Sequence, residues 1–102
     1  MTNFETFVGS HAHAKLARAL ADYEGIHAHL TTLDGFMELT EWVLCDVKGG
    51  DLQFAPALDF MSDILANYYY RGDDCFGRTN EVGDLMKRVD RLLSRINYDC
   101  LV

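Results

Sequence analysis

The chain has 102 residues, of which 49% are hydrophobic and 25% charged, and its formal net charge is −7. This length suits one domain, and the hydrophobic content is too high for an intrinsically disordered chain. A net negative charge repels phosphate groups, so general binding to nucleic acid or to anionic membranes is disfavoured. We therefore expect a single folded domain over residues 1–102 that binds neither nucleic acid nor a membrane directly.

The cysteines, the N-terminus and the hydropathy favour an intracellular protein. Cys45, Cys75 and Cys100 are odd in number and widely spaced, which is more typical of reduced thiols than of a secreted disulfide framework. The first residues lack the basic-then-apolar order of a signal peptide. No apolar run approaches the roughly 18 residues that a membrane-spanning helix needs. We expect a cytoplasmic protein.

Apolar residues recur at three- and four-residue steps along most of the chain, which is the period of an α-helix. Strand-type alternation does not extend over any useful length, and the sequence contains one proline. The sequence therefore predicts an all-α fold, a compact bundle of three main helices plus a short N-terminal helix or turn.

The N-terminal part contains two helix-start signals. Thr2 and Glu5 fit a capping box that starts a short helix, and Ser10 is a candidate N-cap for the next helix. One apolar stripe then continues over residues 12–30 and predicts a helix. Gly25 weakens this helix by roughly 1 kcal/mol relative to alanine, so the sequence also allows a bend or an early end there.

Two further helices follow in the middle of the chain. Residues 31–34 supply cap signals for a helix that ends at 49–50, and residues 51–55 form a turn. Pro56 fits the first turn of the following helix, where its missing N–H costs little, and Gly72 ends that helix. The apolar faces expected to be buried consist of Leu33, Phe36, Met37, Val43, Leu44, Val47, Ala57, Leu58, Met61, Ile64, Leu65 and Tyr68.

The last helix has the clearest pattern. Thr79 is its expected N-cap, although the periodicity extends back to Cys75 and the helix start near Asp74 is an alternative. About two heptads are too short for a convincing free coiled coil, so we favour a core helix of the bundle over a helix-to-helix dimer seam. The apolar stripe of this helix is Val82, Leu85, Val89, Leu92 and Ile96.

The tripeptide His-Ala-His occurs at 11–13 and again at 27–29. Imidazole is a common metal ligand, but residues two apart on a helix point about 200° away from each other and do not chelate one ion. Apart from the weak candidate Asp22 near His27, no ligand pair has helical spacing. We expect no metal site and no cofactor, and we rank a metal-dependent sensor or enzyme third among the functions.

No local pattern marks a catalytic group. Nothing near the cysteines indicates an activated thiol, and the carboxylate pairs have helical spacings on solvated faces. The glycines at 72, 77 and 83 do not form a phosphate-binding loop. We therefore expect a protein that is not an enzyme.

Trp42 lies nearly opposite the centre of the apolar face predicted for its helix, and Leu39 is displaced toward the same side. Acidic residues surround them: Glu38, Glu41 and Asp46. A tryptophan outside the core face with acidic neighbours is typical of a protein–protein hot spot. The alternative, which we weigh equally, is that the N-terminal phenylalanines Phe4 and Phe7 cover Trp42.

Two further sets of residues are candidates for partner binding. Tyr70 and Arg71 follow the core stripe of their helix, and both residue types are enriched in interfaces, although a half-exposed tyrosine at a helix end is common. Arg88, Arg91 and Arg95 align on one face of the last helix. Such a charge run is usually a solvated face with internal ion pairs. The functional interpretation is a docking stripe for an acidic partner.

Charge is unevenly distributed, because residues 1–77 carry a net charge of −8 and residues 78–102 a net charge of +1. We expect a small acidic non-enzymatic regulator or inhibitor that binds another protein and masks a basic or nucleic-acid-binding surface. The general appearance resembles small bacterial regulators and phage-encoded inhibitors, which are a broad type and not one family. The alternative is a homodimeric structural or assembly bundle, sealed by Trp42 or by the last helix.

Overall fold

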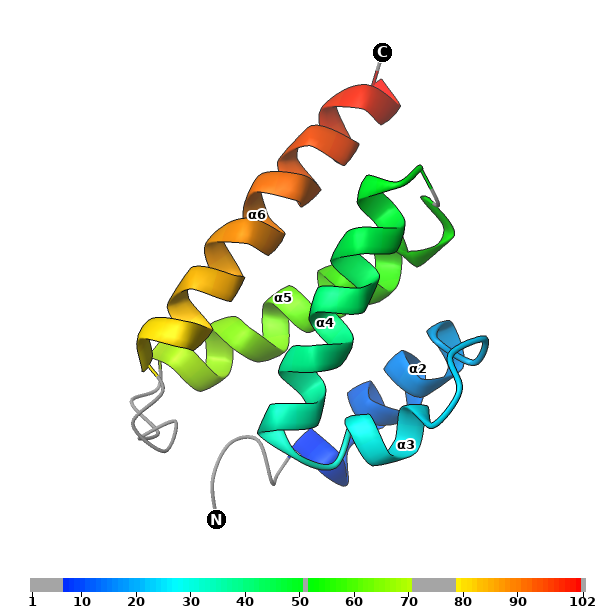
Figure 1. The fold of residues 1–102 in the computed structure, drawn as a ribbon, viewed down its shortest axis with the longest axis vertical. Helices are drawn as coiled ribbons and strands as arrows, with labels where there is room; N and C mark the ends of the chain where they lie inside the picture. Colours follow the sequence, from blue (N-terminus) through cyan, green and yellow to red (C-terminus); the bar gives the residue numbers. More distant parts are fainter. Residues whose placement is uncertain (1–6, 51, 71–78, 102) are drawn as a thin grey trace.

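The computed structural model describes residues 7–50, 52–70 and 79–101, with the backbone alone for 68–70, 79 and 97–101. All regular structure in this part of the chain is helical (Figure 1). The elements are α2 (His11–Ala19), α3 (Ile26–His29), α4 (Leu33–Lys48), the 3₁₀ turn η1 (Leu52–Phe54), α5 (Ala55–Tyr70) and α6 (Thr79–Leu101). The all-α bundle predicted from the sequence is confirmed, and α4, α5 and α6 are its three long helices.

Helix α5 is the element around which the other helices pack. It contacts α6, α4, α2 and the turn η1, whereas the short α3 packs against α4. In Figure 1, α4 and α6 run in the same direction from the lower to the upper part of the molecule, α5 crosses behind α4, and α2 and α3 lie on the opposite side of α4 from α6. The core therefore lies between α5 and a layer formed by α2, α4 and α6.

The helix starts follow local capping rules. The Ser10 side chain accepts a hydrogen bond from the backbone N–H of His13 at 3.3 Å, and Thr32 accepts from the N–H of Gly35 at 3.1 Å. Each bond satisfies one of the N–H groups that a helix leaves unpaired in its first turn. Pro56 lies in the first turn of α5, as its missing N–H predicts. The predicted caps at Ser10 and Thr32 are confirmed.

The continuous helix predicted over residues 12–30 is wrong, and the alternative of a bend or an early end at Gly25 is closer to the structure. Helix α2 ends at Ala19, residues 20–25 form turns, and Gly25 has a φ of 71°, in the left-handed region, directly before α3. Four residues of the stripe are buried all the same: Leu16, Leu20, Ile26 and Leu30. Its other members, Ala12, Ala19 and Tyr23, are exposed or half-buried. Because the chain turns back, α2 packs against α5 while α3 packs against α4, which a straight helix of this length does not allow.

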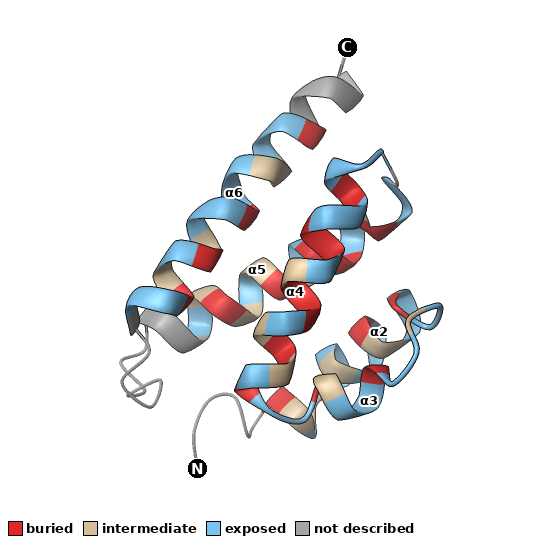
Figure 2. Ribbon diagram, viewed as in Figure 1, coloured by how far each residue is buried: buried red, intermediate tan, exposed pale blue. Residues whose placement is uncertain are grey.

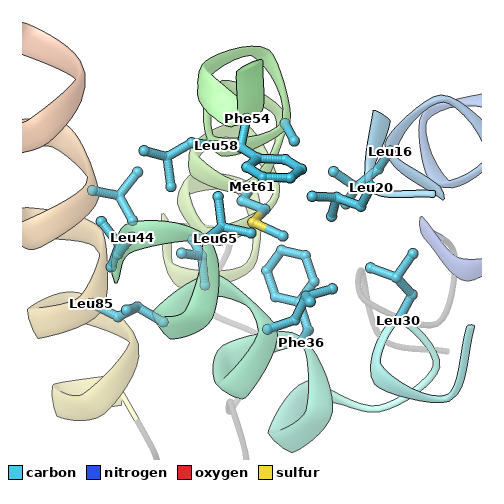
Figure 3. Packing of buried hydrophobic residues seen from close by; sticks show 14 of the residues in the cluster. Leu16, Leu20, Leu30, Phe36, Leu44, Phe54, Leu58, Met61, Leu65 and Leu85 are labelled. Carbon is cyan, nitrogen blue, oxygen red and sulfur yellow. The ribbon is translucent and has the colours of Figure 1, made fainter. Parts of the chain in front are cut away.

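The core contains the apolar faces that periodicity predicted for the long helices (Figures 2 and 3). Phe36 of α4 and Met61 of α5 lie between the leucines of α2 and α3 and those nearer α6 (Figure 3). Of the residues predicted for α4, α5 and α6 whose burial is described, three are half-buried and the others are buried. The half-buried residues are Met37, Ile64 and Leu92.

Helix α4 is buried over a wider arc than its apolar stripe indicates. Leu39 and Thr40 have no exposed surface, and the Thr40 hydroxyl donates a hydrogen bond to the Phe36 carbonyl at 2.8 Å, so its burial leaves no unpaired donor. Phe54 of η1, in the segment predicted as a turn, is also buried and packs against the ring of Tyr23 at a centroid distance of 5.0 Å. The layer of α3 and residues 20–25 covers this side of α4.

The approach of α3 to α4 requires glycine at position 35. A Cβ atom on Gly35 would lie 2.8 Å from the carbonyl oxygen of His29 and 2.9 Å from its Cα. We predict that Gly35→Ala lowers the free energy of unfolding by about 1–3 kcal/mol, because two backbones must separate. Without that clash, alanine would stabilise the helix by roughly 1 kcal/mol. The sign of the change in the free energy of unfolding therefore shows whether the two backbones are in close contact. Urea denaturation measures the effect.

Gly9→Ala is the matched control, since a Cβ there meets nothing within 4 Å. We expect its stability to stay within about 0.5 kcal/mol of the unchanged protein. A Gly35→Ala variant as stable as the unchanged protein would contradict the close approach of α3 to α4.

Candidate interaction surfaces

Trp42 lies on the outer side of α4, and 40% of its surface is exposed. One side of the indole packs against the imidazole of His29 on α3, with ring centroids 4.7 Å apart and planes tilted by 44°. Two carboxylates lie one turn away along α4, Glu38 before it and Asp46 after it, and both are exposed. We call Trp42, Glu38, Asp46 and His29 the Trp42 face.

The Trp42 face is held by contacts from the preceding segment. The Tyr23 hydroxyl donates a hydrogen bond to the carboxylate of Asp46, which ties residues 20–25 to the second half of α4. The His29 ring fixes one side of the indole. An aromatic side chain held in this way loses little conformational freedom when another molecule packs on its open side.

The structure bears on two of the sequence expectations for this surface. Leu39 is fully buried, so its assignment to a partner-binding surface is wrong. The reason is that α3 packs along that side of α4, through Gly35 and His29, and encloses Leu39 in the core. Phe7, one of the residues weighed as a cover for Trp42, packs against the rings of Phe36 and His13, at centroid distances of 6.2 and 5.3 Å. Phe4 lies outside the described residues.

The structure does not test the two candidates at the end of α5, Tyr70 and Arg71. The α5 backbone extends to Tyr70, but the Tyr70 side chain and the whole of Arg71 lie outside the described residues. Their assignment to a partner surface stays a prediction.

Arg88, Arg91 and Arg95 are exposed along α6, as the sequence predicted. With Lys48 from the end of α4 they line an open groove of ≈ 240 Å³ between the two helices. The rest of its lining consists of Leu44, Cys45 and Leu92. Four cationic side chains surround two leucines, so this groove is suited to a ligand that carries an anionic group next to apolar atoms.

A second open groove, of ≈ 430 Å³, lies between the first halves of the same two helices. Its lining is mainly acidic: Asp34, Glu38, Glu41, Glu81 and Asp84, with Met37, Leu85 and Arg88. Arg88 borders both grooves and forms an ion pair with Glu41. The internal ion pair expected for the arginine run thus crosses from α6 to α4. Both partners are exposed, so this pair contributes little to stability.

Two of the four histidines, His13 and His29, pack against aromatic rings, whereas His11 and His27 are exposed. His13 lies edge-on to Phe7 and His29 against Trp42, and the Nε2 atoms of both are buried without a hydrogen-bond partner. Burial lowers the pKa of His13 below its ordinary value of 6.5, and the charge of nearby His27 lowers it further. Within the described ranges, no three His, Cys, Asp or Glu side chains are grouped to hold a metal ion.

The chain was compared with known proteins. No protein-family model matches the sequence, and neither a curated protein nor a solved structure matches it significantly. In the part of the chain that the structure describes, no helix is both long enough and apolar enough to cross a membrane.

The half-buried His13 predicts a pH dependence of stability. Because the pKa of His13 is lower in the folded than in the unfolded chain, the unfolded chain binds more protons as the pH falls through 6.5. Stability due to this group is complete above that pH and is lost as the pH falls through the lowered pKa. We expect the urea midpoint to fall between about pH 7.5 and about pH 5, and His13→Gln to reduce this fall.

His11→Gln is the control for this experiment, since His11 lies exposed on the same helix. We expect it to keep the full pH dependence of the unchanged protein. An equal fall in the His13→Gln variant would show that burial of His13 is not the cause.

The environment of Trp42 can be measured directly, because it is the only tryptophan in the sequence. We expect red-shifted emission that acrylamide quenches readily. His29→Ala should increase the quenching further, since it uncovers the second side of the indole. Blue-shifted emission that acrylamide does not quench would contradict the exposure of this residue.

Proposed function

We propose that this protein is a small, acidic, non-enzymatic regulator that binds another protein through the Trp42 face and masks a basic or nucleic-acid-binding surface of that partner. The observation that carries the proposal is the half-open indole of Trp42 between two exposed carboxylates on α4. The proposal gives His13 and His29 a packing role and requires no metal or cofactor.

The position of Trp42 supports a role as an anchor for a partner. Most large apolar side chains that the structure describes are buried, so an indole with 40% of its surface exposed stands out. Tryptophan is among the residues most enriched at the centres of interfaces, where it fills a pocket of the partner. His29 holds the ring before binding, which lowers the entropy lost when a partner docks.

The charge of the chain indicates the kind of partner. Glu38 and Asp46 flank the indole, and residues 1–77 carry a net charge of −8. Such a surface attracts a cationic partner at a distance and aligns it on contact. A protein groove lined by lysine and arginine, of the kind that binds nucleic acid, has the complementary charge. Occupation of that groove by the Trp42 face would exclude the phosphates.

The test begins with the tagged chain as bait in a nuclease-treated lysate of its native host, followed by purification of the enriched protein. Its affinity is then measured for the unchanged chain and for Trp42→Ala. We expect Trp42→Ala to weaken binding by about 2 kcal/mol or more, a factor of roughly 30, as for other buried aromatic anchors.

Leu52→Ala is the matched control, because Leu52 is a large apolar residue on η1 that is 53% exposed. We expect it to leave the affinity unchanged. Single-stranded nucleic acid should compete with the unchanged chain for the partner. Equal affinity of the Trp42→Ala variant would reject the Trp42 face as the binding site, and simultaneous binding of both ligands would reject masking.

A further inference from the structure

Charged residues recur every seven positions on the facing sides of α4 and α6. Seven residues are about two helical turns, so members of each series lie on one side of their helix, about 10.5 Å apart along the axis. The series are Asp34, Glu41 and Lys48 on α4, and Glu81, Arg88 and Arg95 on α6. Each series begins with an acid and ends with a base.

The two series lie side by side in the same order. Residues from the first halves of both helices line the acidic groove, and residues from the second halves line the basic groove. The middle members, Glu41 and Arg88, pair with each other across the two helices. We call this surface the α4–α6 face. It has an acidic end, a basic end and a neutralised centre.

Helix electrostatics account for part of this order. Asp34 and Glu81 lie in the first turns of α4 and α6, and Lys48 lies in the last turn of α4. Carboxylates are favoured near the positive N-terminus of a helix and cations near its negative C-terminus. Because α4 and α6 run in the same direction, the preferences of the two helices add (Figure 1).

A surface of this design is complementary to itself. Rotation by 180° about an axis through the Glu41–Arg88 pair exchanges the two ends, which lie equally far from the pair along each helix. The acidic groove of one chain therefore lies over the basic groove of a second chain, and the basic groove of the first lies over the acidic groove of the second. This is the requirement of an isologous two-fold interface, in which one patch faces its own copy.

We propose that the α4–α6 face binds a second copy of this chain, with the long helices antiparallel across a two-fold axis at Glu41 and Arg88. The occupant must present a basic and an acidic end at the same spacing and in reverse order, and the chain itself does so. Half-buried apolar side chains, Met37 and Leu92, lie between the charges and supply area that the contact removes from water. The proposal does not depend on the proposed function, because the Trp42 indole lies about 100° further round α4 than Glu41, although Glu38 borders both surfaces.

The net charge of −7 on each chain opposes association, but this repulsion acts over longer distances than the contacts between the grooves. At about 0.1 M salt the screening length is about 10 Å, which weakens repulsion between whole chains more than attraction between touching side chains. The dimer should therefore be present at about 0.1 M salt and should weaken at about 1 M, where screening reaches about 3 Å.

The experiment is sedimentation equilibrium of the full chain at about 0.1 M and at about 1 M salt. Two double variants reverse one end of the face each: Arg91→Glu with Arg95→Glu, and Glu81→Lys with Asp84→Lys. Each should raise the dissociation constant of the dimer by about tenfold or more, since every replaced side chain occurs twice in a two-fold complex. Circular dichroism checks that each variant keeps the helix content of the unchanged chain.

Mixing the two double variants provides the decisive measurement. In a mixed pair, every acidic end faces a basic end again, although neither variant matches its own copy. We expect a heterodimer with a dissociation constant within about tenfold of that of the unchanged dimer. This rescue would not follow if the variants acted only by damaging the fold.

A triple variant serves as the matched control: Lys87→Glu, Asn80→Glu and Ser94→Glu. It lowers the net charge by the same amount as Arg91→Glu with Arg95→Glu, at exposed positions of α6 that line neither groove. We expect it to dimerise like the unchanged chain.

Four results would overturn the proposal. The first is a monomer at every salt concentration, and the second is a dimer that survives both double variants. The third is a failure of the mixed variants to associate. The fourth is a triple control whose dimer is weakened as much as that of the Arg91→Glu, Arg95→Glu variant. A chain that stays monomeric but binds hexaglutamate through Lys48 and Arg95 would assign the basic groove to an acidic peptide instead.

Discussion

The packing of the α3 backbone against α4 is the contact on which the other features of the molecule depend. Gly35 permits it, because a side chain at that position would collide with His29. The contact encloses Leu39 in the core and places the His29 ring against Trp42. It also brings residues 20–25 close enough for Tyr23 to bond Asp46. One backbone contact thus decides which side of α4 is core and which carries the exposed indole.

The side of α4 that faces α6 is determined by a different constraint, the common direction of α4 and α6. Helices that run the same way place their N-terminal acids together and their C-terminal bases together. The result is a surface with separated charges, although the chain as a whole is strongly acidic. An antiparallel pair would have placed acids beside bases within one chain, which satisfies the charges locally and leaves no complementary ends for another molecule.

The sequence predicts features that depend on a single helix, and it fails for features that depend on contacts between helices. The faces of α5 and α6 follow from period alone, and Thr32 and Pro56 mark starts that local hydrogen bonding decides. Leu39 was misjudged because a single apolar stripe reports one packing partner, whereas α4 has several. The sequence allowed a bend or an early end at Gly25, but it did not indicate that α2 ends at Ala19, because the buried leucines keep the helical period across the turns. The Glu41 partner of Arg88 comes from another helix, so spacing along the chain did not identify it.

The two proposed surfaces adjoin on α4, where Glu38 borders both, and their combination has a consequence for binding. A two-fold dimer closed through the α4–α6 face would carry two copies of the Trp42 face, one on each chain. Two linked sites bind a partner that offers two basic surfaces with a far higher effective concentration at the second contact. The weak ion pairs of the α4–α6 face would then control not only assembly but also the avidity of the acidic faces. Salt would accordingly act twice, once on the dimer and once on the contact of each Trp42 face with its basic partner.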